Sequence, residues 1–174
     1  FSLVKGVEPS LDAINQALPR FKEKIIPGMF DYTKFQDEQF DLISFFQTFD
    51  HIIDPNQFLQ DVRNILNDDG HIIAINHNIG SISYKFLKEK SPIIDIGHAY
   101  LYDLITMRKI FEKNDFKVIK VFPIKNVVTP SRLLELLPFN QKSKNILSRI
   151  QSGLGIGNLQ IPLYLGNLGI FAKK

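Results

Sequence analysis

The stretch FDLISFFQTFDHIIDPNQFLQDVRNILNDDGHIIAINHN, residues 40–78, decides the fold because it predicts a strand, a helix and a second strand in succession. Residues 40–46 form an almost continuous apolar run, which is typical of a strand covered by helices on both faces. Asp54 and Pro55 then provide a helix N-cap and a proline at the first helical position. Residues 71–75 predict the next strand. A strand, a helix and a strand in this order predict two parallel strands joined by a crossover helix.

The same alternation continues on both sides of this stretch. It predicts further strands at 1–7, 24–26, 116–122 and 166–172, and further helices at 11–18 and after Asp103. Such a series is typical of an α/β protein with three layers and a mostly parallel sheet. Residues 123–160 interrupt it with two short helical patterns, and we interpret them as a helical insertion before the last strand. We interpret the basic residues of the second pattern as a solvated face, in preference to a membrane-binding or partner-binding one.

The composition is that of one water-soluble globular domain spanning residues 1–174, with 44% apolar and 22% charged residues. A net charge of +3 gives no reason to expect a nucleic-acid partner. The absence of cysteine excludes disulfides and thiolate zinc sites, and it favours a cytoplasmic location. No apolar run reaches the roughly 18–20 residues of a transmembrane helix. Because the sequence opens directly on an apolar segment without methionine, we expect residues to be missing upstream.

Two features at predicted strand and helix ends are candidates for ligand binding, because ligands of an open parallel sheet bind beyond the carboxyl ends of its strands. Glu8 follows the first predicted strand. Its carboxylate could accept hydrogen bonds from two ribose hydroxyls, or it could cap the helix at 11–18. The glycines of GLGIG, residues 153–157, follow a helix and precede an extended segment. We interpret them as a linker, since a phosphate-binding loop leads into a helix N-terminus.

Four segments together resemble the class I S-adenosylmethionine-dependent methyltransferases. They are GVEPS at 6–10, the stretch at 40–78, HAYLYDLITMRKIFEKNDFKV at 98–118 and LGNLGIFAKK at 165–174. More narrowly, they resemble the bacterial branch in which an HxxDP segment follows the fourth strand. The resemblance implies a Rossmann-like sheet of order 3-2-1-4-5-7-6 with an antiparallel last strand, and S-adenosyl-L-methionine bound over the tips of strands 1 to 4. It also implies that strand 1, its helix and its glycine-rich loop are missing, so we expect the isolated chain to be inactive.

The resemblance further implies which residues bind the cofactor. Glu8 matches the acid that binds the ribose, with Pro9 and Ser10 beside it. Met29 and Phe30 fall where the family contacts adenine. Many members carry an acid at the position of Met29, so a hydrogen bond to adenine is expected to be lost here. The tip of the family's fourth strand, beside the sulfonium and the amino-acid part of the cofactor, matches Phe46, Gln47 and Thr48.

Histidines and a tyrosine are candidates for the acceptor side. His51 follows the fourth-strand tip and is the best candidate base, because imidazole can titrate near neutral pH; alternatively, it orders the following loop. His98 and Tyr100 resemble a segment that covers the acceptor pocket, with simple packing as the alternative. His71 and His77 flank a strand with no evident carboxylate partner, so no metal site is predicted.

We therefore predict S-adenosylmethionine-dependent methyl transfer to oxygen of a small molecule, a saccharide or a lipid-linked precursor. The reaction needs an acceptor held in line with the activated methyl group, and a base when the acceptor is a hydroxyl. The alternative is a non-catalytic, methyltransferase-like module that binds a nucleotide or a partner, which the missing acid at Met29 favours. A nicotinamide dehydrogenase would also use Glu8, but its strand order differs near the carboxyl end. An antiparallel last strand would separate the two enzymes.

Overall fold

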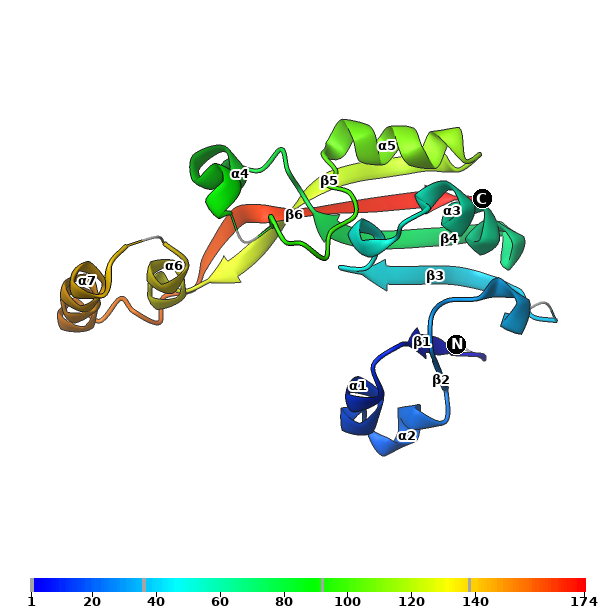
Figure 1. Cartoon of the computed structure of the whole chain (residues 1–174), viewed down its shortest axis with the longest axis horizontal. Coiled ribbons are helices and arrows are strands. Elements are labelled where there is room, and N and C mark those ends of the chain that lie inside the picture. The colour runs from blue at the N-terminus through cyan, green and yellow to red at the C-terminus, as the bar shows by residue number, and fades with distance from the viewer. Residues whose placement is uncertain (1, 36, 92, 138) are drawn as a thin grey trace. The chain divides into compact units, whose positions relative to one another are not determined.

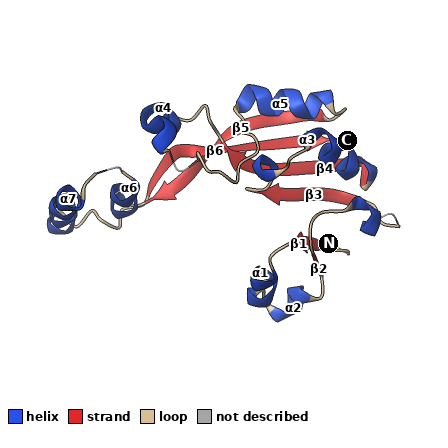
Figure 2. Cartoon of the chain, in the orientation of Figure 1, coloured by secondary structure: helices blue, strands red, loops and turns tan. Residues whose placement is uncertain are grey.

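The computed structural model describes residues 2–35, 37–91, 93–137 and 139–174 of the chain. Its contacts divide the chain into two compact units, unit 1 at Phe1–Gln39 and unit 2 at Phe40–Lys174. Each unit contains both strands and helices (Figures 1 and 2). The α/β class predicted from the alternating pattern is therefore confirmed.

Unit 1 contains a two-stranded parallel sheet. In it, β1 (Gly6–Glu8) pairs with β2 (Ile25–Pro27), and Glu8 lies opposite Pro27. The other elements of this unit are α1 (Leu11–Gln16), α2 (Pro19–Lys22) and the 3-10 turn η1 (Tyr32–Phe35). Because the two strands are parallel, Glu8 and the residues after β2 lie at the same edge of this small sheet.

Unit 2 contains a four-stranded sheet in the order β3-β4-β6-β5. Its strands are β3 (Phe40–Phe46), β4 (Leu66–His77), β5 (Lys117–Val128) and β6 (Ile161–Lys173). β3 and β4 are parallel, whereas β6 is antiparallel to both β4 and β5. In family numbering this sheet has the order 4-5-7-6, and the pair in unit 1 corresponds to strands 2 and 3. The antiparallel last strand is confirmed.

The surroundings of β3 differ from the expectation of a strand buried on both faces. Phe45 is the one buried residue in this strand, while the side chains of Leu42 and Phe46 are 40% and 55% exposed. Among the described residues, β3 pairs with β4 alone and forms an edge of its sheet. The apolar run thus predicted the limits of the strand correctly and its burial wrongly, because burial depends on which elements pack against it.

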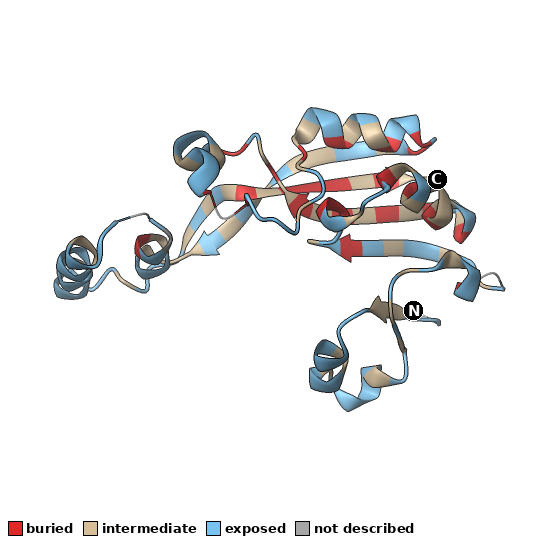
Figure 3. Cartoon of the chain, in the orientation of Figure 1, coloured by how far each residue is buried: buried red, intermediate tan, exposed pale blue. Residues whose placement is uncertain are grey.

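The core of unit 2 lies between the sheet and the helices α3 (Pro55–Asn64) and α5 (Leu104–Lys113), as the burial colours in Figure 3 show. Phe49, in the 3-10 turn η2 (Phe49–His51), is completely buried. Its ring centroid lies 6.0 Å from that of Phe58 in α3 and 5.6 Å from that of Phe111 in α5. Because one ring packs between both helices, they cover the same face of the sheet. This packing anchors η2.

The remaining elements of unit 2 lie in its connections. They are α4 (Ile82–Leu87), the 3-10 turn η3 (Lys88–Lys90), α6 (Pro130–Leu136) and α7 (Gln141–Gly153). Since β5 continues to Val128, the helical connection before β6 begins later than residue 123, where the sequence suggested it. Gly155 has a φ of +67° and lies between α7 and β6, in the order that a linker requires. No helix among the described residues is long and apolar enough to cross a membrane.

Asp103 caps the N-terminus of α5. Its Oδ1 accepts hydrogen bonds from the backbone N–H groups of Thr106 at 2.7 Å and Ile105 at 3.1 Å. The hydroxyl of Thr106 in turn accepts from the N–H of Asp103 at 2.9 Å. The hydrogen bonds from Thr106 and Ile105 lower the pKa of the Asp103 carboxyl, so the capping stabilisation is present at neutral pH and is lost as the pH falls through that lowered value.

Replacing Asp103 with alanine removes this capping acceptor. We expect the free energy of unfolding, measured with urea at neutral pH, to fall by about 1 kcal/mol. Asp103→Asn is the matched control, because an asparagine oxygen can still accept both hydrogen bonds and should retain most of the stability. Equal losses in the two variants would show that the cap does not stabilise α5.

Candidate functional site

The candidate site of unit 2 begins where β3 ends. Gln47, the first residue after this strand, has a φ of +52°, which is uncommon for a residue with a side chain. Its N–H donates to the carbonyl of Ile75 in β4 at 2.7 Å, which holds the turn in place. Its side-chain Oε1 is buried and has no hydrogen-bond partner in the described structure. A constrained backbone and an unpaired buried acceptor at a strand tip are features of binding sites.

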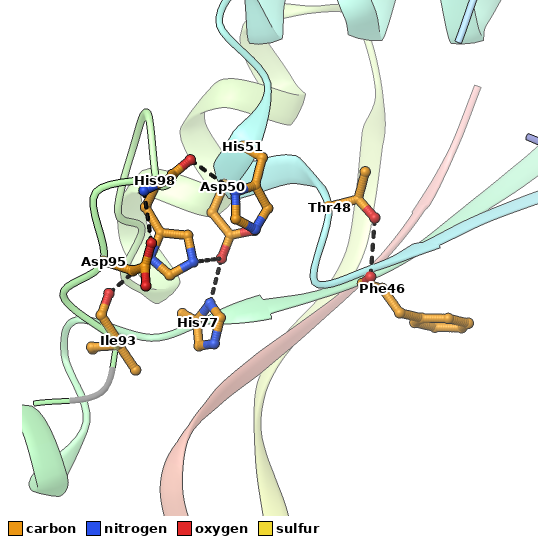
Figure 4. A network of polar contacts seen from close by, with 9 residues as sticks. Phe46, Thr48, Asp50, His51, His77, Ile93, Asp95 and His98 are labelled. Atoms are coloured by element: carbon orange, nitrogen blue, oxygen red, sulfur yellow. Dashed lines mark hydrogen bonds and ion pairs between the residues drawn. The ribbon is translucent and has the colours of Figure 1, made fainter. Parts of the chain in front are cut away.

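The other two predicted residues of this tip are accessible. The ring of Phe46 is 55% exposed, and Thr48 is also exposed. The hydroxyl of Thr48 donates to the carbonyl of Phe46 at 3.0 Å (Figure 4). The structure therefore places Phe46, Gln47 and Thr48 together on the turn that leads from β3 into η2.

Three histidines surround the carboxylate of Asp50 (Figure 4). Asp50 is completely buried. Its Oδ2 lies 2.5 Å from Nδ1 of His77, at the end of β4, and 3.7 Å from Nε2 of His98. The ring of His98 lies 4.7 Å, centroid to centroid, from the rings of both His51 and His77. We call these four residues the histidine cluster.

Backbone carbonyls fix the orientation of two of these rings. Nδ1 of His51 lies 2.8 Å from the carbonyl oxygen of Gly97, and Nδ1 of His98 lies 2.9 Å from that of Ile93. A carbonyl oxygen can only accept, so each Nδ1 must carry the hydrogen. In a neutral ring the other nitrogen, Nε2, then holds a lone pair that can accept a proton or bind a metal.

The loop that follows η3 is attached to η2 through its backbone. The N–H groups of Ala99 and Tyr100 donate to the carbonyl of Asp50 at 2.8 and 3.1 Å. These bonds bring His98 beside His51 and leave the side chain of Tyr100 46% exposed. The structure therefore brings together the three residues that were predicted for the acceptor side, which are His51, His98 and Tyr100.

Burial and charge affect two ionisable groups here in opposite directions. Burial alone would raise the pKa of the Asp50 carboxyl, but the hydrogen bond from His77 and the positive charge that His77 and His98 can carry lower it overall. Asp50 is therefore a carboxylate at neutral pH. Burial raises the pKa of Tyr102, with smaller contributions from Tyr100 and Asp50, so its hydroxyl keeps its proton. That hydroxyl has no hydrogen-bond partner among the described residues.

The predicted cofactor residues of unit 1 lie after β1 and β2. Glu8 is half-buried, and its Oε1 accepts a hydrogen bond from the N–H of Ser10 at 2.8 Å. The alternative role of Glu8 as a helix cap is wrong, because the side chain of Ser10 caps α1. Pro9 is exposed between them.

The apolar pair after β2 presents one exposed and one stacked side chain. Met29 is 71% exposed, while the ring of Phe30 stacks on that of Phe35 with centroids 6.2 Å apart. Met29 and Phe30 therefore offer an apolar surface, and neither side chain has a carboxylate that could accept a hydrogen bond. The binding roles of these residues stay predictions.

Sequence reasoning missed Asp50 and gave His77 no partner. It considered His77 with His71, but six residues of a strand separate two side chains by about 20 Å. The structure places His71 against Phe171, with ring centroids 5.1 Å apart, and His77 against Asp50. The available signal was the expected parallel pairing of the two strands. Their carboxyl ends lie at the same edge of the sheet, so a residue just after β3, such as Asp50, comes close to a residue at the end of β4, such as His77.

The mixed sheet of unit 2 has the strand order β3-β4-β6-β5 and an antiparallel last strand, which is the arrangement of the Rossmann-like methyltransferase fold. The family model described as a methyltransferase domain matches residues 1–121. The chain therefore belongs to the class I S-adenosylmethionine-dependent methyltransferases, and S-adenosyl-L-methionine is the cofactor of its family. None of the curated proteins compared with it matches.

Solved structures with the same fold are longer than this chain. A S-adenosylmethionine-dependent methyltransferase from Archaeoglobus fulgidus is 18% identical, with a TM-score of 0.60, and the match covers 97% of this chain and 75% of that one. A possible histamine N-methyltransferase from Thermotoga maritima is 16% identical, with a TM-score of 0.62 and coverages of 99% and 73%. The cyclopropane synthase MmaA2 from Mycobacterium tuberculosis is 13% identical, with a TM-score of 0.57 and coverages of 99% and 70%. At these identities the likeness concerns the fold.

Proposed function

We propose that this chain, as part of the full-length protein, transfers the methyl group of S-adenosyl-L-methionine to an oxygen atom of a small molecule, a saccharide or a lipid-linked precursor. The observation that carries this proposal is the strand order with an antiparallel β6, which agrees with the methyltransferase family and not with a nicotinamide dehydrogenase. We further propose that α6 and α7 are an insertion in this fold, since they separate two strands that are antiparallel neighbours.

In unit 1, Glu8 is proposed to bind the ribose of the cofactor. The N–H of Ser10 holds Oε1 of this carboxylate at the end of β1, which suits a group that must receive two adjacent hydroxyls. Met29 and Phe30 are proposed to pack against the adenine. A thioether is a weak acceptor, so recognition of the adenine amine by the side chain of Met29 is expected to be poor.

In unit 2, the turn after β3 is proposed to bind the amino-acid part of the cofactor. The buried, unpaired Oε1 of Gln47 fits a ligand with a hydrogen-bond donor, such as an ammonium group. The exposed ring of Phe46 and the hydroxyl of Thr48 flank it. The residues present therefore fit the group that the family binds.

The histidine cluster is proposed to serve the acceptor. The cofactor, when bound, supplies an activated methyl group, so the protein must align the acceptor and remove its proton. His51 is proposed as the base that takes this proton at Nε2, because its Nδ1 hydrogen is directed at the carbonyl of Gly97. His98 and Tyr100 are proposed to contact the acceptor from the neighbouring loop.

Binding of the cofactor tests this proposal directly. In the full-length protein, we expect Glu8→Ala to raise the dissociation constant of S-adenosyl-L-methionine at least tenfold in a calorimetric titration, because a charged hydrogen bond contributes roughly 1.5–3 kcal/mol. Glu23→Ala is a matched control, since Glu23 is an exposed acid of the same unit that follows α2. Unchanged affinity in Glu8→Ala would remove Glu8 from the site, and no binding by the full-length protein would contradict the proposed function.

A non-catalytic binding module is the second candidate, because Met29 stands where many methyltransferases have an acid. Release of S-adenosylhomocysteine in the presence of hydroxylated acceptors would support the enzyme. Cofactor binding without such release, across small alcohols, saccharides and lipid-linked sugars, would support the module. The cytoplasmic location and the absence of a nucleic-acid partner stay predictions from composition.

A further inference from the structure

We propose that Asp50, His51 and His98 bind one divalent transition-metal ion of the zinc class. One potential ligand atom of each residue lies within 4.8 Å of those of the other two. The inference concerns metal binding itself and does not require the proposed function. A bound metal would occupy the lone pair on Nε2 of His51, so this ring would act as a base only in the metal-free protein.

The first support is the direction of the lone pairs. The Nδ1 hydrogens of His51 and His98 are used by the carbonyls of Gly97 and Ile93. Metal-binding histidines characteristically donate their second N–H to a carbonyl or carboxylate in this way, which fixes the ring and leaves Nε2 as the ligand. In His98 that atom already faces the carboxylate, 3.7 Å from Oδ2 of Asp50.

The second support is an excess of acceptors in a buried place. When both rings are neutral, two imidazole lone pairs and a carboxylate meet here, and a carboxylate has no hydrogen to donate. Oδ1 of Asp50 is buried and has no hydrogen-bond partner among the described residues. A buried, unpaired carboxylate oxygen is costly unless a cation compensates it. A dication would neutralise this oxygen pair and bind both ring nitrogens at once.

The geometry requires a small contraction of the cluster. Bonds of about 2.0–2.2 Å in a tetrahedral zinc site place ligand atoms roughly 3.3 Å apart. His98 Nε2 and Asp50 Oδ2 are at 3.7 Å, close to this value. His51 is exposed, and its ring would have to approach the other two together with the loop carbonyl of Gly97 that it contacts. His77 would orient the carboxylate from outside the coordination sphere, through its hydrogen bond to Oδ2.

The ligand set selects the kind of metal. Two imidazoles and one carboxylate suit zinc, cobalt, nickel or ferrous iron, whereas magnesium and calcium prefer oxygen ligands throughout. Three protein ligands leave at least one coordination position for water or a ligand oxygen. We commit to zinc, with cobalt as its spectroscopic substitute.

The test uses the full chain after treatment with a chelator and its removal. Titration with zinc chloride should show one equivalent bound, and cobalt chloride should produce the visible absorption of a site with low coordination number. His51→Ala and His98→Ala should each weaken zinc binding at least tenfold. His71→Ala is the matched control, because His71 is a histidine of the same unit that stacks on Phe171, away from the cluster. This variant should bind zinc like the unaltered chain.

Several results would overturn the proposal. Zinc binding that survives in His51→Ala and His98→Ala, or that is lost equally in His71→Ala, would show adventitious binding. An absence of zinc binding by the unaltered chain would also overturn the proposal. Circular dichroism of His51→Ala checks folding, and this exposed position should tolerate the change. Binding of S-adenosyl-L-methionine is measured separately with chelator present, so failure of the metal site does not affect the proposed function, and the converse also holds.

Discussion

Replacing His51 with alanine in the full-length protein is expected to slow methyl transfer about 100-fold, the usual contribution of a positioned general base. The alanine cannot accept the proton of the acceptor hydroxyl, while the turn after β3 that is proposed to bind the cofactor is unchanged. The turnover number should therefore fall, and the affinity for S-adenosyl-L-methionine should stay the same. Release of S-adenosylhomocysteine, measured in chelator-treated buffer, reports the rate without interference from a metal at the same ring.

Two controls separate a base from a residue that only orders its loop. Imidazole added to His51→Ala should restore part of the rate, because the substitution removes a ring at an exposed position where a small base can enter. His71→Ala should retain the full rate. A His51→Ala variant that turns over normally would leave His51 with the structural role alone, as the donor to the carbonyl of Gly97.

Replacing Phe49 with alanine is expected to lower the free energy of unfolding by about 3–5 kcal/mol. The side chain is completely buried, and its ring packs on those of Phe58 and Phe111 from two helices and on Tyr102, 5.2 Å away. Alanine would leave a cavity that the sheet and both helices would have to shift to fill. Urea unfolding followed by circular dichroism measures the loss.

A matched aromatic control is available on the surface. Phe86, in α4, is 83% exposed, so Phe86→Ala should change the stability by less than about 0.5 kcal/mol. A loss below about 1 kcal/mol in Phe49→Ala would show that α3 and α5 do not depend on this ring for their packing. Because Phe49 immediately precedes Asp50 and His51, the same variant should also weaken any zinc binding by the cluster.

The elements that could be predicted were those with local causes. Asp54 accepts from the N–H of Gln57 and begins α3, as the Asp-Pro pair indicated. Asp103 begins α5 for the same reason. The limits of β3 at Phe40 and Phe46 followed from its apolar run. The order of the strands came from the resemblance to methyltransferases and not from any periodicity, since local patterns do not say which strands become neighbours.

The residues of the candidate site show the same difference between what local sequence predicts and what depends on packing. His51 and His98 were singled out by their positions after predicted strands and in a recognisable segment, whereas Asp50 was missed because an acid beside a histidine gives no sign of its burial. Its burial follows from Phe49, which enters the core next to it.

The sequence by itself determined where β3, α3 and α5 of this chain begin, which cofactor its family binds, and which side chains stand at the end of β3. Only the tertiary structure decided that Asp50 meets His77 and His98, from positions far apart in the chain. The physical reason is that parallel pairing of β3 with β4 brings their carboxyl ends to one edge, and hydrogen bonds from Ala99 and Tyr100 then fold a distant loop onto it.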